Sequence, residues 1–553
     1  MSTSRSRVLA GAVALALVSG GGVLGGDLAS ATAQSGSAAV VPSADPVRSG
    51  RLDLGAPDLA ETRSTRALQP GVTLTEITRG GADSHLVWTL EALIPASSSS
   101  PDPDAPPRSI SDEASARAQA DRLAAKGFPA RVERVAQPPT ADVPAGTLGY
   151  RVRLGSYATK AEADAANVRL AAAGEHASSV YTGWDGNPAD RGPWHLKVVT
   201  LDPRSFRGTL DASYGPDLHD RETTSALSRA AGATVGVNAG FFVLDPAAGA
   251  PGDPAGVGVY RGRLLSEPTN GRPALVMHDD GSRTGVERLS WQGRVSVNGR
   301  GVGRLAGVNR VPGLIRNCGG DSGDSPTALP LHDVTCTDDS ELVAFTPQFG
   351  TRTPTGPGRE VVVDAHHVVR SVNAERGTAL APGLTTVQAT GTSAGALADV
   401  HVGERLDVSA GLVGEDGHAR ATDPGTTIVN GGPQLMQGGR ERITQQQDGM
   451  VHPGDPSFAY GWVVKRNPRT FAGVDARGRT VIVTVDGRST DDLGLSIPEA
   501  ADVARSLGLV DAINLDGGGS TTMAVGGQVV NHPSDATGER PVGDALLVLP
   551  TRR

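Results

Sequence analysis

An aspartate followed by three glycines and three hydroxyl residues stands near the C-terminal end of the sequence, in NLDGGGSTT (514–522). Three glycines cost backbone entropy, which a fold accepts where the chain must approach a ligand closely or adopt positive φ. The amides of such a loop can bind an anion, with Asp516 at the edge of the cradle. The simpler alternative is a tight turn with a capping aspartate. The candidate residues of this segment are Asp516, Gly517, Gly518, Gly519, Ser520 and Thr521.

Two asparagine–glycine turns have a similar character. In VGVNAGFF (235–242) a strand-like run delivers Asn238 and Gly240 to a turn followed by two phenylalanines, and IVNGGPQLM (428–436) places Asn430 and Gly431 in the same way. An asparagine can bond a sugar hydroxyl, and an aromatic ring can stack on a sugar face. The alternative is a left-handed asparagine turn with phenylalanines in the core.

Two arginines accompany another pair of segments. NPRT (467–470) contains Arg469 and leads to an apolar strand that ends in Asp486-Gly487-Arg488. Arginine is the natural bidentate partner of a phosphate group, because its planar donors match the oxygens of the anion. Viewed singly, each arginine is also consistent with an ordinary surface charge.

In this order, NAGFF, NGGP, NPRT…VDGR and NLDGGGSTTM…PSD resemble the phosphodiester glycosidase family, over about 194–549. The resemblance implies a mixed α/β fold and hydrolysis of a sugar phosphodiester at the anomeric carbon. A cysteine-containing loop at 318–336 and an additional N-terminal module depart from the family pattern. The positions that match the family are Asn238, Gly240, Asn430, Gly431, Arg469, Thr470, Asp486, Arg488, Asp516, Gly517, Gly518, Ser520 and Asp535.

The resemblance suggests a division of roles. Arg469, Arg488 and the glycine amides would stabilise charge on the phosphate. A carboxylate would act as general base on water or as nucleophile, with Asp516 the first choice and Asp486 the second. Asp535 would hold substrate hydroxyls or a cation. Calcium or magnesium would suit such an acidic phosphate site, but no metal motif is present and no cofactor is assigned.

A rival hypothesis uses a serine. GTSAG (391–395) fits the G-x-S-x-G pattern, and Ser393, Asp516 and His532 follow the chain order of a serine esterase triad. A nucleophile elbow is followed by a helix, whereas this segment soon enters a strand-like run, which disfavours the esterase. YGW (460–462) is interpreted as a packing strand near the site, with sugar stacking by Trp462 as its alternative.

Two domains must position these residues. From Trp194 to the C-terminus, strand-like runs predominate over a few helical patterns, which predicts a large α+β domain with mixed sheets over 194–553. Residues 86–185 predict a small βαββαβ, ferredoxin-like module, and YRVRLGSY (150–157) resembles a SPOR domain. That resemblance implies binding of peptidoglycan, and we expect Arg151, Arg153 and Tyr157 on an exposed face. The alternative is a spacer without a ligand.

The N-terminus predicts export. Two arginines, an apolar run and Ala31-Thr32-Ala33 indicate a signal peptide over 1–33, with a retained anchor as the alternative, and the polar residues 34–85 are interpreted as a linker. No later segment has the length of apolar run that a membrane span needs. In an exported chain, the only two cysteines, Cys318 and Cys336, predict one disulfide, with two free thiols as the alternative.

The net charge of −9 argues against sequence-independent binding of nucleic acid, which needs a basic face. The sequence therefore predicts a secreted or wall-associated hydrolase that cleaves sugar-1-phosphodiesters in cell-wall polymers or glycans. The alternative from another class is a wall protein that binds glycan without turnover, and the serine esterase is the third hypothesis.

Overall fold

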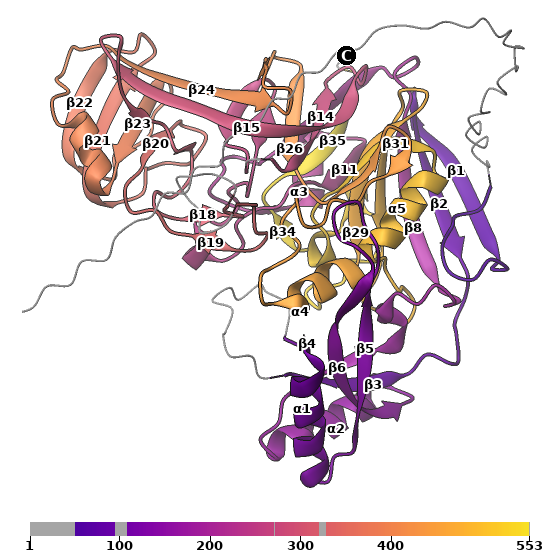
Figure 1. Cartoon of the computed structure of the whole chain (residues 1–553). Helices are drawn as coiled ribbons and strands as arrows, with labels where there is room; N and C mark the ends of the chain where they lie inside the picture. The colour runs from indigo at the N-terminus through magenta and orange to yellow at the C-terminus, as the bar shows by residue number, and fades with distance from the viewer. Residues whose placement is uncertain (1–49, 95–107, 270, 320–327, 552–553) are drawn as a thin grey trace, which may run out of the picture. The chain divides into compact units, whose positions relative to one another are not determined.

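An eight-stranded sheet, buried on both faces except at its two edge strands, forms the centre of the structure (Figure 1). The computed structural model describes residues 50–94, 108–269, 271–319 and 328–551, within one unit, Val47–Arg553. The expected signal peptide lies outside the described residues. In order, the strands are β1 (Glu61–Gln69), β2 (Val72–Arg79), β8 (Trp194–Leu201), β30 (Thr480–Val485), β29 (Arg469–Asp475), β31 (Leu509–Asn514), β27 (Gln434–Gln437) and β28 (Arg440–Glu441).

A second sheet packs on one face of the central sheet. Ile482 and Ile513 of the central sheet share a core with Val237 and Val548 of the second, because alternate residues of a strand point to opposite faces. The five strands lie in the order β33 (Gln528–Val529), β32 (Met523–Val525), β11 (Val235–Asn238), β35 (Ala545–Pro550) and β9 (Gly208–Ser213).

The opposite face of the central sheet is covered by helix α5 (Ile497–Ser506) and by the N-terminal module. Phe471 and Val483 point to this side, where they share a core with Ala501. Ser496 caps α5 and Glu499 completes the capping box. This packing fixes the strand ends from which the candidate residues project.

A third sheet extends into an arm, defined as residues 291–410 (Figure 1). The long strand β15 pairs with β14 near its start and with β24 over the rest of its length. The third sheet contains β13 (Arg263–Ser266), β12 (Gly258–Tyr260), β26 (Thr426–Asn430), β14 (Pro273–His278), β15 (Thr284–Val297), β24 (Leu406–Gly414), β25 (Ala419–Arg420) and β16 (Arg300–Arg304). The sheet of the arm contains β17 (Gly307–Val308), β20 (Leu342–Phe345), β23 (Leu384–Ala389), β21 (Gly356–Asp364) and β22 (Val369–Arg376).

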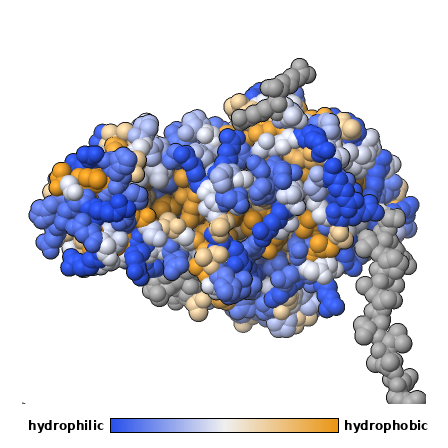
Figure 2. All heavy atoms as spheres, turned by 90° about the horizontal axis from the view of Figure 1, so that it is seen from above, coloured by the Kyte–Doolittle hydropathy of each residue, from blue (hydrophilic) through white to orange (hydrophobic). Residues whose placement is uncertain are grey.

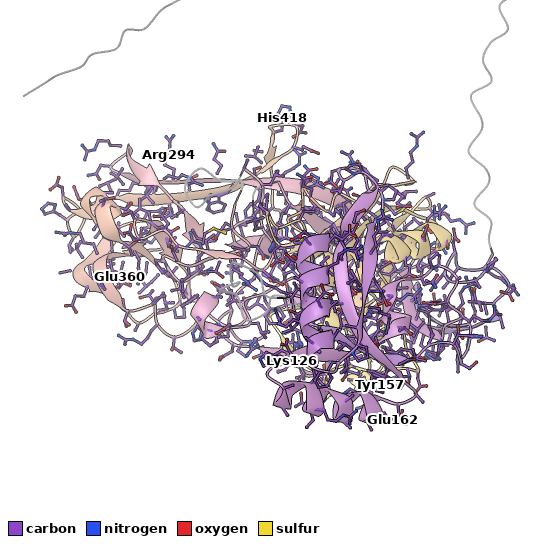
Figure 3. The ribbon with its side chains drawn as sticks, turned by 60° about the horizontal axis from the view of Figure 1, so that its bottom comes forward. Lys126, Tyr157, Glu162, Arg294, Glu360 and His418 are labelled. Atoms are coloured by element: carbon purple, nitrogen blue, oxygen red, sulfur yellow. A yellow bond between two sulfur atoms is a disulfide. The ribbon has the colours of Figure 1, made fainter. Side chains whose placement is uncertain are left out.

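The N-terminal module has the predicted βαββαβ order. Two helices, α1 (Glu113–Ala125) and α2 (Lys160–Ala172), contact one antiparallel sheet, and Thr159 caps α2 in a capping box with Glu162 (Figure 3). The strands are β4 (Ile110–Ser111), β6 (Gly146–Tyr157), β3 (Trp88–Ala92) and β7 (Ala177–Tyr181), with β5 (Ala130–Gln137) on β6. The predicted α+β class is thus observed, and among the described strand pairs only β17–β20, in the arm, is parallel.

The linker interpretation of residues 34–85 is wrong for its described part. Strands β1 and β2 form a hairpin, and β2 pairs with β8 along its whole length. Val72, Leu74 and Ile77 are buried, because alternate side chains of β2 enter the cores on the two sides of the central sheet. Residues 61–79 therefore belong to the large domain.

Short elements complete the fold. Two small ribbons pair β10 (Glu222–Thr223) with β34 (Pro541–Val542) and β18 (Ile315–Arg316) with β19 (Thr335–Cys336), and the remaining helices are α3 (Thr224–Ala231) and α4 (Pro456–Ala459). The disulfide between Cys318 and Cys336 is present, as predicted. Across the described ranges, no helix combines the length and apolar character that crossing a membrane requires. The face in Figure 2 is largely hydrophilic, with hydrophobic residues between.

Candidate active site

Asp516 lies just beyond the end of β31, where three chain segments meet. Its backbone N–H donates to the carbonyl of Ala239 at 3.0 Å, and its carbonyl accepts from the Asn238 side chain at 2.7 Å. One residue earlier, the N–H of Leu515 donates to Thr470 at 2.8 Å. The ends of β11 and β29 therefore fix the position of the aspartate.

The carboxyl group of Asp516 has a perturbed pKa. Removal from water raises the pKa to about 6, while the Ser520 hydroxyl, the Arg540 guanidinium and the Gly517 N–H act in the opposite direction. The Gly517 N–H donates to Asp516 Oδ1 at 2.9 Å. A carboxyl group of this kind is largely ionised at pH 7 yet readily protonated, which suits general base or nucleophilic catalysis.

The glycine turn after Asp516 is required by close contacts. Gly518 has φ 58°, and a Cβ there would lie 3.1 Å from Arg488 Nη2. A Cβ on Gly519 would overlap the carboxylate of Asp535 and the guanidinium of Arg540. The glycines thus bring two arginines close to the aspartate.

The expected anion cradle of glycine amides is smaller than the sequence suggests. The Gly517 N–H is used by Asp516, and the Gly518 N–H donates to the carbonyl of Pro468 at 2.9 Å. Two of the three amides therefore bond within the protein. Positive charge for an anion comes mainly from side chains.

The two predicted arginines differ in their availability. Arg469 is buried, and its guanidinium donates to the backbone carbonyls of Leu495 and Trp462. Burial and the nearby charge of Arg488 lower the pKa of Arg469 to about 9. Arg488 is exposed at the pocket, and its Nε donates to Asn467 Oδ1 at 3.1 Å. Arg488 is thus the better placed of the two for a ligand.

Arg540 is a site residue that the sequence reasoning missed. It lines the pocket and forms a two-point ion pair with Asp535, with distances of 2.8 and 3.1 Å. Asp535 was predicted to hold substrate or a cation. In the structure it positions Arg540. Only the PSD motif pointed to this region, and no motif marked the arginine five residues later.

Asp486, the second catalytic candidate, does not line the pocket. Its Oδ1 accepts from the Asn531 side chain at 2.8 Å and from the His532 N–H at 3.1 Å. The side-chain atoms of Asp486, Asp492 and His532 that could bind a metal ion lie within 4.8 Å of one another. An imidazole with two carboxylates suits a transition metal better than calcium or magnesium, which prefer oxygen ligands. These residues therefore fit the expected calcium or magnesium poorly.

The predicted asparagines support the site from behind. Asn238 is fully buried, and its Oδ1 accepts from the Thr470 hydroxyl at 2.7 Å and from the Thr522 N–H at 3.1 Å. Asn430 is buried and bonds both backbone polar groups of Phe241. A Cβ on Gly431 would lie 2.7 Å from the Asn514 carbonyl. The side-chain amides of Asn238 and Asn430 therefore hold neighbouring backbone segments in place and do not face the pocket.

Asp544 is a further residue that the sequence reasoning missed. Its carboxylate accepts from the Gly240 N–H and the Tyr260 hydroxyl, both at 2.8 Å, and burial raises its pKa to about 6. It orders the turn whose Ala239 carbonyl receives the Asp516 N–H. No sequence signal beyond a single aspartate before a strand marks it.

A pocket of about 640 Å³ opens above Asp516. Asp516, Arg469, Arg488 and the three glycines line it, whereas the other predicted residues do not. Trp462 lines it too, from a helical turn at Tyr460–Val464, so the predicted strand there is wrong. The ring of Trp462 contacts His332 and Phe241, with centroids 4.5 and 6.0 Å apart.

The disulfide segment forms a second part of the wall. Asn317 and Asp333, one residue before and fifteen after Cys318, line the pocket and are joined by a 2.8 Å bond from the Asp333 N–H to Asn317 Oδ1. Asp333 is also paired with Arg316 at 3.0 Å. The cross-linked segment that departs from the family pattern thus contributes to the pocket.

The N-terminal module forms the third part. Its residues Glu91, Ser109, Ser178, Val180 and Trp184 line the pocket together with Lys465 of the large domain. Trp184 is half-buried, and its indole N–H donates to the carbonyl of Ser489 at 3.2 Å. The sequence reasoning did not foresee that the module takes part in the site.

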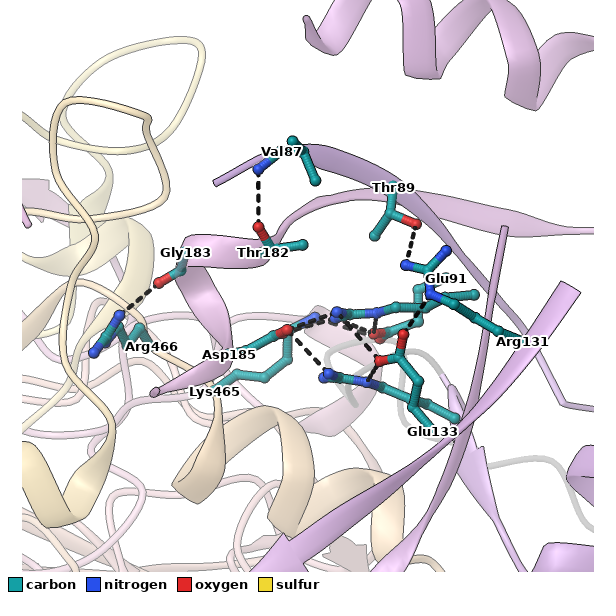
Figure 4. A network of polar contacts seen from close by, with 12 residues as sticks. Val87, Thr89, Glu91, Arg131, Glu133, Thr182, Gly183, Asp185, Lys465 and Arg466 are labelled. Atoms are coloured by element: carbon teal, nitrogen blue, oxygen red, sulfur yellow. Dashed lines mark hydrogen bonds and ion pairs between the residues drawn. The ribbon is translucent and has the colours of Figure 1, made fainter. Parts of the chain in front are cut away.

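The expectation that Arg151, Arg153 and Tyr157 share an exposed face is wrong for the arginines. Arg153 is 1% exposed, and it is paired with Glu91 at 2.8 Å and with Asp185 at 2.6 Å (Figure 4). Arg151 donates to the Tyr460 hydroxyl at 2.8 Å. This charged face of the module docks on the large domain, which a local sequence pattern cannot reveal.

Ser393 lies in a short helical turn that contacts β21 and β23 of the arm. Its hydroxyl donates to the backbone carbonyl of Ser340 at 2.8 Å. Neither Asp516 nor His532 contacts it among the described residues, and it does not line the pocket. The structure therefore gives no support to the esterase hypothesis.

A family model for phosphodiester glycosidases matches residues 357–549, and a model for SPOR domains matches residues 108–182. The chain carries both domains. The phosphodiester glycosidase match includes Asp516, Arg488 and Arg540, whereas Asn238 and Gly240 precede it. The SPOR match falls within the N-terminal module.

The chain is similar to known proteins over different shares of its length. The bovine N-acetylglucosamine-1-phosphodiester alpha-N-acetylglucosaminidase is 30% identical over 147 residues, which cover 26% of this chain and 28% of that protein. A crystal structure of a Burkholderia pseudomallei protein is 34% identical with a TM-score of 0.80, covering 90% of this chain and 98% of that one. A hypothetical protein from Synechocystis shares 17% identity and a TM-score of 0.50 over 90% of this chain and 81% of its own, which supports the fold alone.

Proposed function

We propose that this protein is a hydrolase that cleaves the bond between the anomeric carbon of a sugar and a phosphodiester. One observation carries the proposal: Asp516, with a pKa raised to about 6, lines a pocket together with Arg488 and Arg540. The phosphodiester glycosidase match and the activity named for the bovine relative support the same reaction class.

The geometry suggests how the residues share the reaction. Arg488 and Arg540 provide positive charge for the phosphodiester and for the charge that develops as it leaves. Because the group that leaves is a phosphate monoester, which is a good leaving group, little acid assistance is required. Asp516 then acts at the anomeric carbon, either as nucleophile or as general base on a water molecule. Arg469 positions the backbone of Trp462 and does not bind the substrate.

The proposed setting is outside the cytoplasm. The N-terminal export pattern and the disulfide between Cys318 and Cys336 both favour an oxidising compartment. The SPOR match favours a glycan environment, and peptidoglycan-associated or other wall polymers with sugar-1-phosphate links are the proposed substrates.

The alternative is a wall protein that binds glycan without turnover. The observation in its favour is that the pocket walls contain the rings of Trp184 and Trp462, which suit sugar stacking. The two functions differ in one respect. Asp516→Asn abolishes turnover in an enzyme, and a pure binder has no turnover to lose.

The test is release of free sugar from a panel of sugar-1-phosphodiesters that includes an N-acetylglucosamine-1-phosphodiester. Wild type, Asp516→Asn and Arg488→Ala are compared, with Arg294→Ala as a matched control, because Arg294 is an exposed arginine on the arm (Figure 3). We expect release by wild type and by the control only. Absence of release from every substrate by wild type would contradict the proposal. A parallel series with a chelator tests a cation requirement.

A further inference from the structure

The N-terminal module is held in one position by a buried ionic network. Glu91 bonds Arg153, Lys465 and the Tyr460 hydroxyl, and despite burial the charges of Lys465 and Arg153 depress its pKa to about 2. Figure 4 shows Glu91, Asp185 and Lys465 of this network. Asp185 adds a second anion beside Arg153. Since the network joins the module's sheet to the large domain, the module's contribution to the pocket is fixed.

The edge of the module lies beside the arginine proposed to bind phosphate. The indole N–H of Trp184 donates to the carbonyl of Ser489, the residue after Arg488. The guanidinium of Arg466 donates to the Gly183 carbonyl at 2.8 Å, and Arg466 precedes Asn467, which accepts from Arg488. The turn at 182–185 is therefore adjacent to the proposed phosphate position.

The pocket is larger than a sugar phosphate requires. Its volume of about 640 Å³ falls in the range of roughly 300–1,000 Å³ that holds drug-sized ligands. Its wall carries Trp184, Val180 and Ser178 of the module, of which Trp184 bonds the residue after Arg488. An aromatic ring with neighbouring hydroxyls is suited to the face and rim of a sugar.

We propose that the N-terminal module supplies the aglycone subsite of the hydrolase: Trp184, Val180 and Ser178 contact sugar units attached on the far side of the phosphodiester. This inference rests on the proposed function. It makes the module a determinant of substrate choice, because substrates with a glycan aglycone gain contacts that a short aglycone lacks.

The experiment compares two ligands with the same sugar phosphate, one with a methyl aglycone and one with an oligosaccharide aglycone. For wild type we expect kcat/KM to be at least about tenfold higher for the oligosaccharide. Trp184→Ala removes most of this preference through KM, with little change for the methyl ligand. Ser178→Phe narrows the subsite and does the same. Because Ser178 lies opposite Glu91 in the sheet, denaturant unfolding of this variant checks that the ionic network is intact. Val168→Ser, at an exposed position of α2, serves as control.

Binding measurements keep the test independent of turnover. The affinities of Asp516→Asn and of Asp516→Asn/Trp184→Ala for both uncleaved ligands are measured by calorimetry. A preference for the oligosaccharide that depends on Trp184 supports the subsite even if no ligand is hydrolysed, in which case only the proposed function fails. Equal affinity of Asp516→Asn for both ligands, or an equal loss of affinity for both ligands in Asp516→Asn/Trp184→Ala, would overturn the subsite.

Discussion

Burial gives two aspartates of the site similar pKa values but different roles. Asp516 lines the pocket. Asp544 is 3% exposed, and its carboxylate accepts hydrogen bonds from the Gly240 N–H and the Tyr260 hydroxyl. A carboxylate that faces the pocket can react with a bound ligand. A carboxylate whose oxygens accept hydrogen bonds from the protein holds the surrounding chain in place. The sequence marked Asp516 by its glycine turn, but nothing local distinguished Asp544.

Asp544→Asn should change how stability depends on pH. The folded-state pKa of Asp544 is about 6, against an ordinary value of 3.8. Between these values the folded protein holds a proton that the unfolded chain has lost, so the wild-type free energy of unfolding falls as pH rises. The variant lacks this loss, so its free energy of unfolding relative to that of wild type should rise by up to about 3 kcal/mol between pH 4 and pH 7. Denaturant titrations of both proteins at pH 4 and pH 7 measure this rise. The same difference in free energy of unfolding between variant and wild type at both pH values would refute the prediction.

At the scale of elements, local signals predicted local structure well. Thr159 and Ser496 begin α2 and α5 with capping boxes, which are local signals because a capping box is complete within four residues. The hairpin at 61–79 was missed because β1 is exposed over most of its length and β2 acquires its partner, β8, from far along the chain. Tyr460–Val464 resembled a strand because aromatic and β-branched residues favour strands, yet packing makes it helical.

The glycine turn offers a test at this scale. Gly519→Ala introduces a Cβ that overlaps both members of the Asp535–Arg540 pair, so Arg540 must move. Because a preorganised charged donor contributes strongly to catalysis, we expect kcat/KM to fall at least about tenfold while the fold is retained. Gly395→Ala is the matched control, since its Cβ meets no atom within 4 Å. Steady-state kinetics and circular dichroism decide, and full activity of Gly519→Ala would be inconsistent with the proposed role of Arg540.

At the scale of the whole chain, the site is assembled from segments that no local pattern connects. Trp184, Asn317 and Arg540 line one pocket, although they come from the N-terminal module, the disulfide segment and the C-terminal region. The sequence predicted both domains. The sequence could not predict that the charged face of the N-terminal module is buried against the large domain. The local pattern around Arg153 is typical of an exposed strand residue, and its partners Glu91 and Asp185 are distant in the sequence.

Glu91→Gln tests the docking of the two domains. Glu91 is buried and ionised, and its removal leaves Arg153 and Lys465 with less compensating charge. Breaking a buried ion pair costs about 3–5 kcal/mol, so the variant should be less stable by that order. Glu113→Gln, which breaks a pair with Arg117 that is exposed to solvent, should destabilise the protein much less. Denaturant unfolding measures both, and equal effects would show that docking does not depend on the network.

The dependence of kcat/KM on pH tests the role of Asp516 most directly. A phosphodiester does not titrate between pH 4 and 8, so an acidic limb in this range belongs to the protein. If Asp516 must be ionised, kcat/KM rises tenfold per pH unit below about pH 6 and levels off above it. The control is His195→Gln, because the hydrogen bond to Asp492 raises the pKa of the His195 imidazole, and the limb persists in this variant. A profile that is flat from pH 4 to 7, or a limb lost in His195→Gln, would contradict the account.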